Sequence, residues 1–177
     1  MKKLSMNELN RMNIDEFKHS SKFPVVVVLD NVRSMNNIGS VFRTCDAFRI
    51  DEIYLCGITA QPPHKDIEKT ALGATQSVNW TYFETTKEAV NKLIENNYDV
   101  FAIEQVEQSI MLDEFNFCDY KKIALIFGNE VLGVEQQIID MCCGSIEIPQ
   151  FGTKHSLNIS VSAGIVLWQL IYSYRKN

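Results

Sequence analysis

The sequence predicts a single α/β domain built on a mainly parallel β-sheet with flanking helices. Short apolar runs of strand length alternate with helical patterns along the chain, which is the order that βαβ units produce. The run at 25–29 follows Pro24 and contains only valine and leucine, which is typical of a strand buried on both faces of a parallel sheet. The length of 177 residues suits one domain of ordinary size.

Each element is expected from its own pattern. Gly57, Gly128 and Pro149 close strand-like runs, because glycine and proline interrupt regular strands. Strands are expected at 25–29, 53–56, 100–103, 123–127 and 145–148, and helices at 39–47, 87–97, 135–142 and 156–174. The last helix carries apolar residues close to one face, as in a helix that packs one side on a sheet: Leu157, Val161, Ile165, Trp168 and Tyr172.

The first 22 residues are polar with loosely helical apolar spacing, so we expect an N-terminal helical arm (1–22) ahead of the main domain (23–177). No apolar run approaches the roughly 20 residues that a membrane span needs. Polar residues also interrupt any signal-peptide core after Lys2 and Lys3, so a cytoplasmic protein without a membrane partner is expected. The five cysteines include no Cys-x-x-Cys pair and are expected to be reduced, partly buried thiols.

The formal net charge of −5 argues against a free-standing nucleic-acid binder, because such proteins are usually basic. The negative charge is concentrated in residues 99–140, where nine acidic residues stand against only Lys121 and Lys122. The remaining 15 basic and 13 acidic residues can form local basic patches. Weak, salt-sensitive contact with RNA therefore remains compatible with the sequence.

Three loops after predicted strands are polar or rich in glycine: 30–43, 128–134 and 149–158. Ligands of parallel sheets bind where such loops leave the carboxyl ends of the strands, so the three are expected to converge on one site. Dinucleotide, zinc-protease and serine-hydrolase motifs are missing, and Val134 stands where a phosphate loop needs lysine. The three histidines lie in unrelated loops, so no metal is expected.

The residues of these loops also have ordinary structural interpretations. Gly39 permits a close approach of backbone or ligand, and Arg43 follows one turn later on the same helix face, directed near the strand end. The alternative is a helix-capping asparagine and a solvated arginine. Ser156 or Asn158 is expected to cap the last helix.

Taken together, the loops carry three spaced groups of residues. Asn37, Gly39 and Arg43 have the spacing Asn-x-Gly-x-x-x-Arg. The second group is Ile126-Phe127-Gly128-Asn129-Glu130 with Gly133, and the third is Ile148-Pro149, Gly152 and Ser156-Leu157-Asn158 with Ser160. In this order they resemble the motifs of the SpoU (TrmH-like) branch of the SPOUT superfamily, the tRNA/rRNA ribose 2′-O-methyltransferases. The segment Thr-Ala-Leu-Gly-Ala at 70–74 also looks like that family, and the resemblance covers roughly residues 24 to 172.

The resemblance implies transfer of a methyl group from S-adenosylmethionine to a ribose 2′-hydroxyl of tRNA or rRNA, without a metal. It also implies a homodimer and a deep C-terminal trefoil knot. The catalytic residues that it implies are Arg43, Asn37, Glu130, Ser156 and Asn158. The cofactor contacts are Ile103, Glu104, Gly128, Asn129, Ile148, Gln150, Ser156, Leu157 and Asn158, and the RNA contacts are Asn37, Arg43, Lys154 and His155.

An arginine side chain stays protonated, so we expect Arg43 to hold a phosphate or the developing alkoxide rather than to remove a proton. In a dimer, Arg43 of one subunit is expected near the cofactor of the other. Val131 and Leu132 depart from the small or polar residues of many relatives. Two alternatives remain: a catalytically silent RNA-binding or assembly module on the same scaffold and, more distantly, a cysteine-dependent hydrolase or flavodoxin-like protein.

Overall fold

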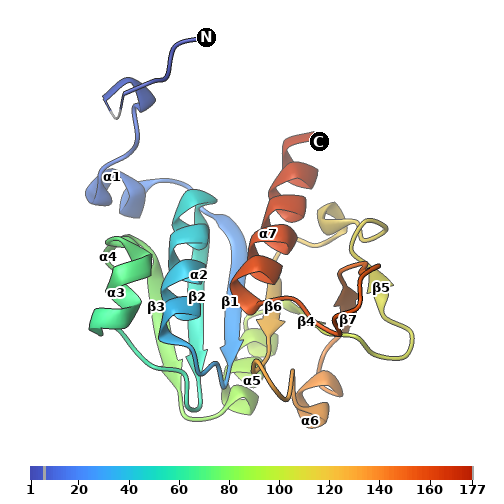
Figure 1. Ribbon diagram of the computed structural model, residues 1–177. Helices are drawn as coiled ribbons and strands as arrows, with labels where there is room; N and C mark the ends of the chain where they lie inside the picture. Colours follow the sequence, from blue (N-terminus) through green and yellow to red (C-terminus); the bar gives the residue numbers. More distant parts are fainter. Residues whose placement is uncertain (6, 177) are drawn as a thin grey trace.

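Parallel strands form one sheet in the computed structural model, which describes residues 1–5 and 7–176 (Figure 1). The spatial order is β3-β2-β1-β6-β4-β7-β5, and every neighbouring pair is parallel. The strands are β1 (Phe23–Asp30), β2 (Ile50–Cys56), β3 (Asn79–Phe83), β4 (Asp99–Ile103), β5 (Ile110–Met111), β6 (Ile123–Phe127) and β7 (Gly144–Glu147). The parallel α/β fold predicted from the alternating patterns is therefore confirmed.

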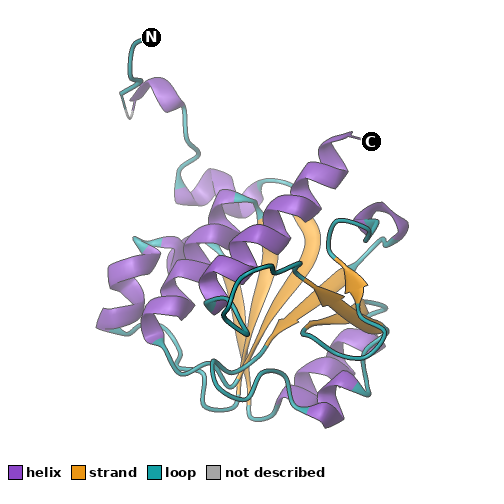
Figure 2. Cartoon of the chain, turned by 45° about the vertical axis from the view of Figure 1, so that its right-hand side comes forward, coloured by secondary structure: helices purple, strands orange, loops and turns teal. Residues whose placement is uncertain are grey.

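Helices cover both faces of this sheet (Figures 1 and 2). One face carries α2 (Met35–Ala47), α3 (Lys65–Ala71), α4 (Ala74–Ser77) and α7 (Ile159–Lys176), and the other carries α5 (Thr86–Glu95) and α6 (Gln136–Ile139). Short 3₁₀ turns, η1 (Asn7–Leu9) and η2 (Phe117–Asp119), lie outside these layers, as does α1 (Ile14–His19).

Strand β1 shows why the valine run is buried. Successive side chains of a strand point to opposite faces, so Val25 and Val27 join the core under α2 and α7, whereas Val26 and Val28 join the core under α5 and α6. All four are fully or almost fully buried. Truncation of one such side chain to alanine in a close-packed core costs about 2–4 kcal/mol.

Several element boundaries differ from the sequence prediction. Helix α2 begins at Met35 rather than at residue 39, because the Ser34 side chain caps it by accepting from the Asn37 N–H. Helix α6 is only four residues long instead of spanning 135–142. Helix α3 and strands β3 and β5 were not predicted; β3 is a half-exposed edge strand and β5 has only two residues, so neither has an apolar run.

The apolar stripe predicted on the last helix lies on the wrong side for the core. Helix α7 begins at Ile159 and packs on the sheet through a different face: Ile159, Ala163, Val166, Leu167, Leu170 and Ile171. The stripe residues instead face outward, with Trp168 54% exposed. Leu157 precedes the helix and is also exposed, so its interpretation as core was wrong. Helix α7 therefore has apolar residues on two faces, and only one of them meets this chain's core.

Helix α1 is anchored to the rest of the fold by Phe17. Asn13 and Glu16 make a reciprocal capping box at the start of α1, and Phe17 is buried against the main core. All five cysteines are free thiols, of which Cys45 and Cys56 are buried and Cys143 is exposed. Among residues 1–5 and 7–176, no helix is both long and apolar enough to cross a bilayer.

Candidate functional site

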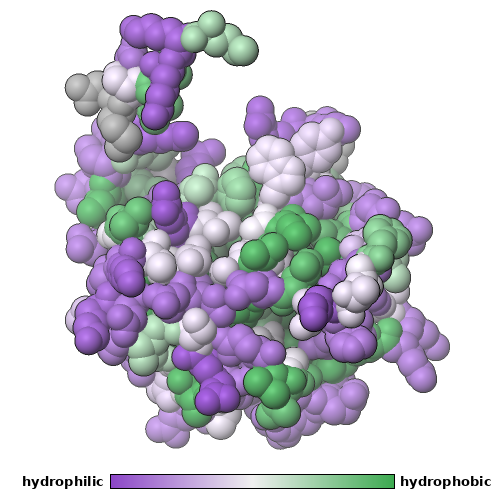
Figure 3. All heavy atoms as spheres, viewed as in Figure 1, coloured by the Kyte–Doolittle hydropathy of each residue, from purple (hydrophilic) through white to green (hydrophobic). Residues whose placement is uncertain are grey.

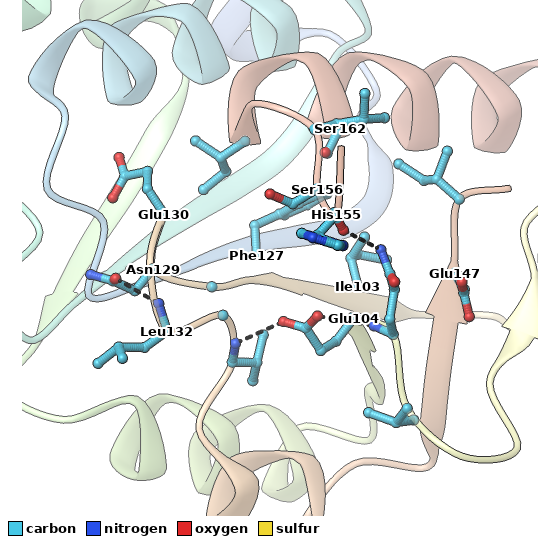
Figure 4. A pocket seen from close by; sticks show the side chains of 18 of the residues that line it. Ile103, Glu104, Phe127, Asn129, Glu130, Leu132, Glu147, His155, Ser156 and Ser162 are labelled. Carbon is cyan, nitrogen blue, oxygen red and sulfur yellow. Dashed lines mark hydrogen bonds between the residues drawn. The ribbon is translucent and has the colours of Figure 1, made fainter. Parts of the chain in front are cut away.

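A cavity of about 740 Å³ lies at the carboxyl ends of β4, β6 and β7 (Figure 4). The loops that leave these strands form its walls, and the first turn of α7 closes one side. Two of the three predicted loops therefore line one cavity, as expected for the carboxyl edge of a parallel sheet. The loop after β1 borders the same region, because Glu130 binds it directly.

The loop after β6 is a tight turn built by glycine. Asn129 and Gly133 pair through two backbone hydrogen bonds of 3.0 and 2.9 Å, and the Asn129 side chain accepts from the N–H groups of Val131 and Leu132. Gly133 has a φ of +70°, which favours glycine. A Cβ on Gly128 would lie 2.2 Å from the Gly133 carbonyl carbon. The turn therefore brings bare backbone to the cavity wall.

Glu104, at the end of β4, holds this turn from the opposite side. Its carboxylate accepts from the Val134 N–H at 3.0 Å and from the Gln105 N–H at 3.0 Å. The Gln105 amide then donates to the His155 carbonyl at 2.9 Å, so the loop after β4 also contacts the loop that leads to α7 (Figure 4). These hydrogen bonds link all three cavity walls.

Glu130 joins the loop after β6 to the start of α2. Its carboxylate accepts from the backbone N–H groups of Arg33 and Ser34, both at 3.0 Å, and from the Asn37 side-chain amide at 3.2 Å. Partial burial opposes ionisation of Glu130, but these hydrogen bonds outweigh it and hold the pKa of Glu130 below its usual range. The positive end of the α2 dipole favours the same charge. Glu130 is thus an ionised anchor rather than a free surface acid.

Asn158 extends this network to the third loop. Its Nδ2 donates to Asn37 Oδ1 at 3.2 Å, while its Oδ1 accepts from the Ser160 N–H at 2.9 Å and caps α7. Asn158, not Ser156, is therefore the cap of the last helix. The side chains of Glu130, Asn37 and Asn158 form one hydrogen-bonded chain that spans the three predicted loops.

The structure brings most of the predicted site residues together. Glu130 and His155 line the cavity. So do all nine residues expected to contact a cofactor: Ile103, Glu104, Gly128, Asn129, Ile148, Gln150, Ser156, Leu157 and Asn158. Asn37 reaches the cavity's border through Glu130. Residues that lie far apart in the sequence thus share one concave surface.

Arg43 and Lys154 lie outside the cavity lining. Arg43 is exposed on α2, two turns beyond its first residue, and Lys154 is exposed in the loop before α7. Gly39 faces α3 so closely that a Cβ there would lie 2.2 Å from the Ile67 carbonyl oxygen. The glycine of the first motif therefore serves helix packing, and Arg43 does not enter the cavity of its own chain.

Sequence reasoning missed two kinds of site residue. Apolar wall residues such as Phe127 and Ile146 belong to ordinary strands, so nothing in their pattern marks them. The backbone N–H groups of Arg33 and Ser34 bind Glu130, and backbone donors leave no signature in a sequence. Ser34 was the one feature of the sequence that could have indicated these donors, because serine is a preferred N-cap and the N–H groups at a helix start are free to bind an anion.

The cavity combines apolar walls such as Ile103 and Phe127 with polar side chains such as Gln150, which suits an organic ligand that has both apolar and polar parts. Within the described part of the chain, no cluster of histidine, cysteine or acidic side chains has the grouping that holds a metal ion. The site is thus equipped to bind and orient an organic molecule.

Residues 24–168 match the model of the SpoU rRNA Methylase family, and the chain belongs to that family. It is 34% identical over 147 residues to the tRNA (guanosine(18)-2′-O)-methyltransferase of Aquifex aeolicus, an alignment that covers 82% of this chain and 67% of the relative. The fold matches the crystal structure of the A. aeolicus TrmH/SpoU tRNA modifying enzyme with a TM-score of 0.81 at 24% identity, over 92% of this chain and 81% of that one.

A further match is the AdoMet-bound rRNA methyltransferase of Sinorhizobium meliloti, with a TM-score of 0.78 at 25% identity. That alignment covers 86% of this chain and 57% of the S. meliloti chain. The resemblance to the SpoU branch seen in the three motifs is therefore confirmed by the family model and by the fold.

Proposed function

We propose that the chain is an S-adenosylmethionine-dependent RNA methyltransferase that modifies a ribose 2′-hydroxyl. Family membership and the names of its relatives support the reaction class. The observation that carries the proposal is the hydrogen-bonded chain Glu130–Asn37–Asn158, which joins matched residues of all three motifs beside one cavity. A catalytically silent module on the same scaffold has no comparable support among the relatives.

The cavity fits S-adenosylmethionine in size and chemistry. Its volume of about 740 Å³ lies within the usual range for a site that encloses such a ligand. Gly128 and Gly133 line the cavity, and a Cβ on either would collide with the turn or with the Glu104 carboxylate, so the wall keeps its shape only with glycine at these positions. We assign the nucleoside part to backbone groups of Gly128, Ile148 and Leu157, with Ile103 as an apolar wall.

S-adenosylmethionine supplies a methyl group activated by a positively charged sulfur, so the chain itself has to position the acceptor and exclude water. In the transfer, the bond from the 2′-oxygen to the methyl carbon forms as the carbon–sulfur bond breaks. The hydroxyl proton passes to a phosphate oxygen or to water. Glu130 and Asn158 hold Asn37 in place beside the acceptor, and the cation of Arg43 stabilises the developing negative charge.

Arg43 does not line the cavity of its own chain. It can therefore stabilise the developing negative charge only in the cavity of a second copy of the chain. The outward apolar face of α7 supports such a homodimer. Val161, Ile165 and Trp168 are exposed there and border a shallow groove with Leu112 and Pro149. Figure 3 shows hydrophobic side chains gathered over this helix, as expected for a surface that a second copy covers.

The dimer has a direct test. Trp168→Glu places a charge on the outward face of α7 without touching the core face, so it is expected to give a folded monomer with little methyl transfer. Sedimentation and circular dichroism measure these two properties. Mixtures of Arg43→Ala and Asn158→Ala chains, each inactive alone, are expected to regain part of the activity. Wild-type chain that sediments as a monomer at working concentrations would contradict the dimer.

The reaction class is tested with labelled S-adenosylmethionine and RNA from cells that lack this gene. Labelled 2′-O-methylribose in tRNA or rRNA is the expected product. Arg43→Ala is expected to abolish turnover while the dissociation constant of S-adenosylmethionine, measured by calorimetry, stays within a few-fold. Wild-type chain that binds no S-adenosylmethionine would exclude the proposal, and binding without any transfer would favour the silent module.

Three further expectations accompany this proposal. We propose that residues 23–177 form the methyltransferase domain with residues 1–22 as an arm, and that the protein works in the cytoplasm, where its RNA is accessible. We also propose that the segment after β7 is threaded as a trefoil knot. The bond from Gln105 to the loop before α7 supports a close crossing of these segments. A crystal structure traced through residues 99–176 tests the threading.

A further inference from the structure

Arg33 is a cation at the border of the site, and the sequence motifs do not include it. It lies between β1 and α2, one residue before the helix cap Ser34. Its backbone N–H donates to Glu130 Oε2 at 3.0 Å, whereas its side chain is exposed. The same short loop therefore carries both the donor that fixes Glu130 and a guanidinium that points away from the core.

The guanidinium of Arg33 forms no ion pair with the carboxylate of Glu130. Glu130 takes three uncharged donors: the N–H groups of Arg33 and Ser34, and the amide of Asn37. Within residues 1–5 and 7–176, the ion pairs are Lys2–Glu8 and His64–Asp66, so Arg33 pairs with no acid there. A cation beside a carboxylate that is already satisfied stays available to an external anion.

Hydrogen bonds fix the backbone of the loop that carries Arg33, from Asn31 to Ser34. Asn31 N donates to the Cys56 carbonyl, Val32 N donates to Thr59 Oγ1 at 2.9 Å, and the N–H groups of Arg33 and Ser34 both reach Glu130. The Asn31 carbonyl also accepts from the Asn129 side chain at 2.7 Å. A loop this constrained loses little backbone entropy when its side chain binds a ligand.

Arg33 lies just before α2, and Arg43 lies on α2 two turns beyond its first residue. Both arginine side chains are exposed. The helix rises about 12 Å from Met35 to Arg43, so a guanidinium ahead of its first turn and one beyond its second turn suit different phosphates of one strand. In a chain of net charge −5, such local cations are needed to hold an RNA backbone.

We propose that Arg33 binds a backbone phosphate of the RNA, at a nucleotide flanking the one that is methylated, through charge-assisted hydrogen bonds from its guanidinium. This inference rests on the proposed RNA methyltransferase function. It makes Arg33 a substrate-binding residue that acts on RNA affinity and register, not on the chemical step or on S-adenosylmethionine.

The test compares full-length wild type, Arg33→Ala, Arg33→Lys and Arg175→Ala. Arg175 is a matched control, because it is an exposed arginine near the far end of α7, away from the carboxyl edge of the sheet (Figure 1). Dissociation constants for unmodified RNA are measured across a salt series, together with kcat, the KM for RNA and the dissociation constant for S-adenosylmethionine.

Arg33→Ala is expected to raise the KM for RNA roughly 5- to 30-fold and to reduce the slope of log affinity against log salt by about 0.7–0.9. At saturating RNA, kcat and S-adenosylmethionine binding are expected to stay within about twofold of wild type. Arg33→Lys is expected to restore the salt slope, because lysine keeps the charge. Arg175→Ala is expected to match wild type throughout.

The inference is wrong if Arg33→Ala keeps the wild-type salt slope and KM for RNA. It is also wrong if Arg33→Ala weakens S-adenosylmethionine binding as strongly as RNA binding, because the side chain then acts on the fold of the loop. Wild-type chain that methylates no RNA would instead contradict the proposed function. The measurements on wild type alone decide this, so the two failures can be told apart.

Discussion

The Asn37 side chain lies 3.2 Å (Nδ2 to Oε1) from the Glu130 carboxylate, although 93 residues separate them in the chain. This contact joins the start of α2 to the turn after β6. Asn37 also accepts from Asn158 at 3.2 Å, so its amide orientation is determined on both sides. One asparagine therefore connects an ionised anchor to the cap of the last helix.

Replacing Glu130 with glutamine tests the charge of this anchor. The glutamine side chain keeps the shape, but its NH₂ group has to face a donor and it loses the charge-assisted bonds, so the two loops are expected to separate. We expect a loss of about 1 kcal/mol in the free energy of unfolding, because Glu130 is partly exposed. We also expect a loss of roughly 100-fold in kcat/KM through misplacement of Asn37.

Urea unfolding and steady-state kinetics measure the two effects. Glu114→Gln is the matched control, because Glu114 is an exposed acid in the same acidic segment, outside the cavity lining. If Glu130→Gln and Glu114→Gln behave alike, Glu130 is a solvated acid and the anchor does not exist.

Asn158→Asp separates the capping role of Asn158 from its contact with Asn37. Aspartate still accepts from the Ser160 N–H, so α7 stays capped and stability is expected to change by less than about 0.5 kcal/mol. The second carboxylate oxygen, however, faces Asn37 Oδ1 and removes the donor, so activity is expected to collapse.

Asn158→Ala provides the comparison, because it removes both roles and is expected to lose about 1 kcal/mol as well as activity. Thermal unfolding and methyl transfer are measured in parallel. Full activity in Asn158→Asp would show that the Asn37 contact is dispensable.

Gly128→Ala tests the close approach of backbone at the cavity wall. The added Cβ would lie 2.2 Å from the Gly133 carbonyl carbon and 2.3 Å from the Val134 nitrogen, so the turn has to open. We expect destabilisation of about 1–3 kcal/mol and S-adenosylmethionine binding weakened at least tenfold. Calorimetry and denaturation measure these changes.

Gly152→Ala is the control for stability, because a Cβ there meets no atom within 4 Å. Its free energy of unfolding is expected to stay within about 0.5 kcal/mol of wild type. Equal stability of Gly128→Ala and wild type would mean that the turn adapts and is no rigid cradle.

Asp30 predicts a pH dependence of stability. It is buried at the end of β1, its Oδ1 accepts from Thr86 and Asn31, and its Oδ2 has no partner among the described residues. Burial raises its pKa, and nearby Glu135 adds to this, while the hydrogen bonds oppose it. The folded state therefore holds the proton more tightly than the unfolded chain, whose aspartate pKa is about 3.9.

The contribution of Asp30 to stability is therefore greatest below that unfolded value and declines as pH rises through the folded-state pKa. Asp30→Asn is expected to remove this decline, so the variant gains on wild type as pH rises above about 4. Denaturation midpoints across the pH series measure it. A constant difference between Asp30→Asn and wild type at every pH would contradict the prediction.

Local patterns were sufficient for much of the fold. The uninterrupted valines of β1 identify a strand buried on both faces, because only a central parallel strand hides every side chain in turn. The residues 123–127 were predicted as a strand with the bounds that β6 has. The three polar loops were expected to meet because parallel strands end at one edge, and the Glu130–Asn37–Asn158 contacts agree.

Other features depend on contacts that no local pattern reveals. Helix α7 has apolar residues on two faces, and periodicity cannot say which face meets the sheet, so the stripe with Trp168 was misassigned. The direction of Arg43 depends on how α2 rotates against α3, where Gly39 allows close contact. The sequence alone was enough for the strands other than β3 and β5, for the loops that carry the chemistry and for the family, because these follow from local patterns. The chain's fold in three dimensions decided which helix faces are buried and which carboxylates are satisfied, because both depend on contacts between residues far apart in sequence.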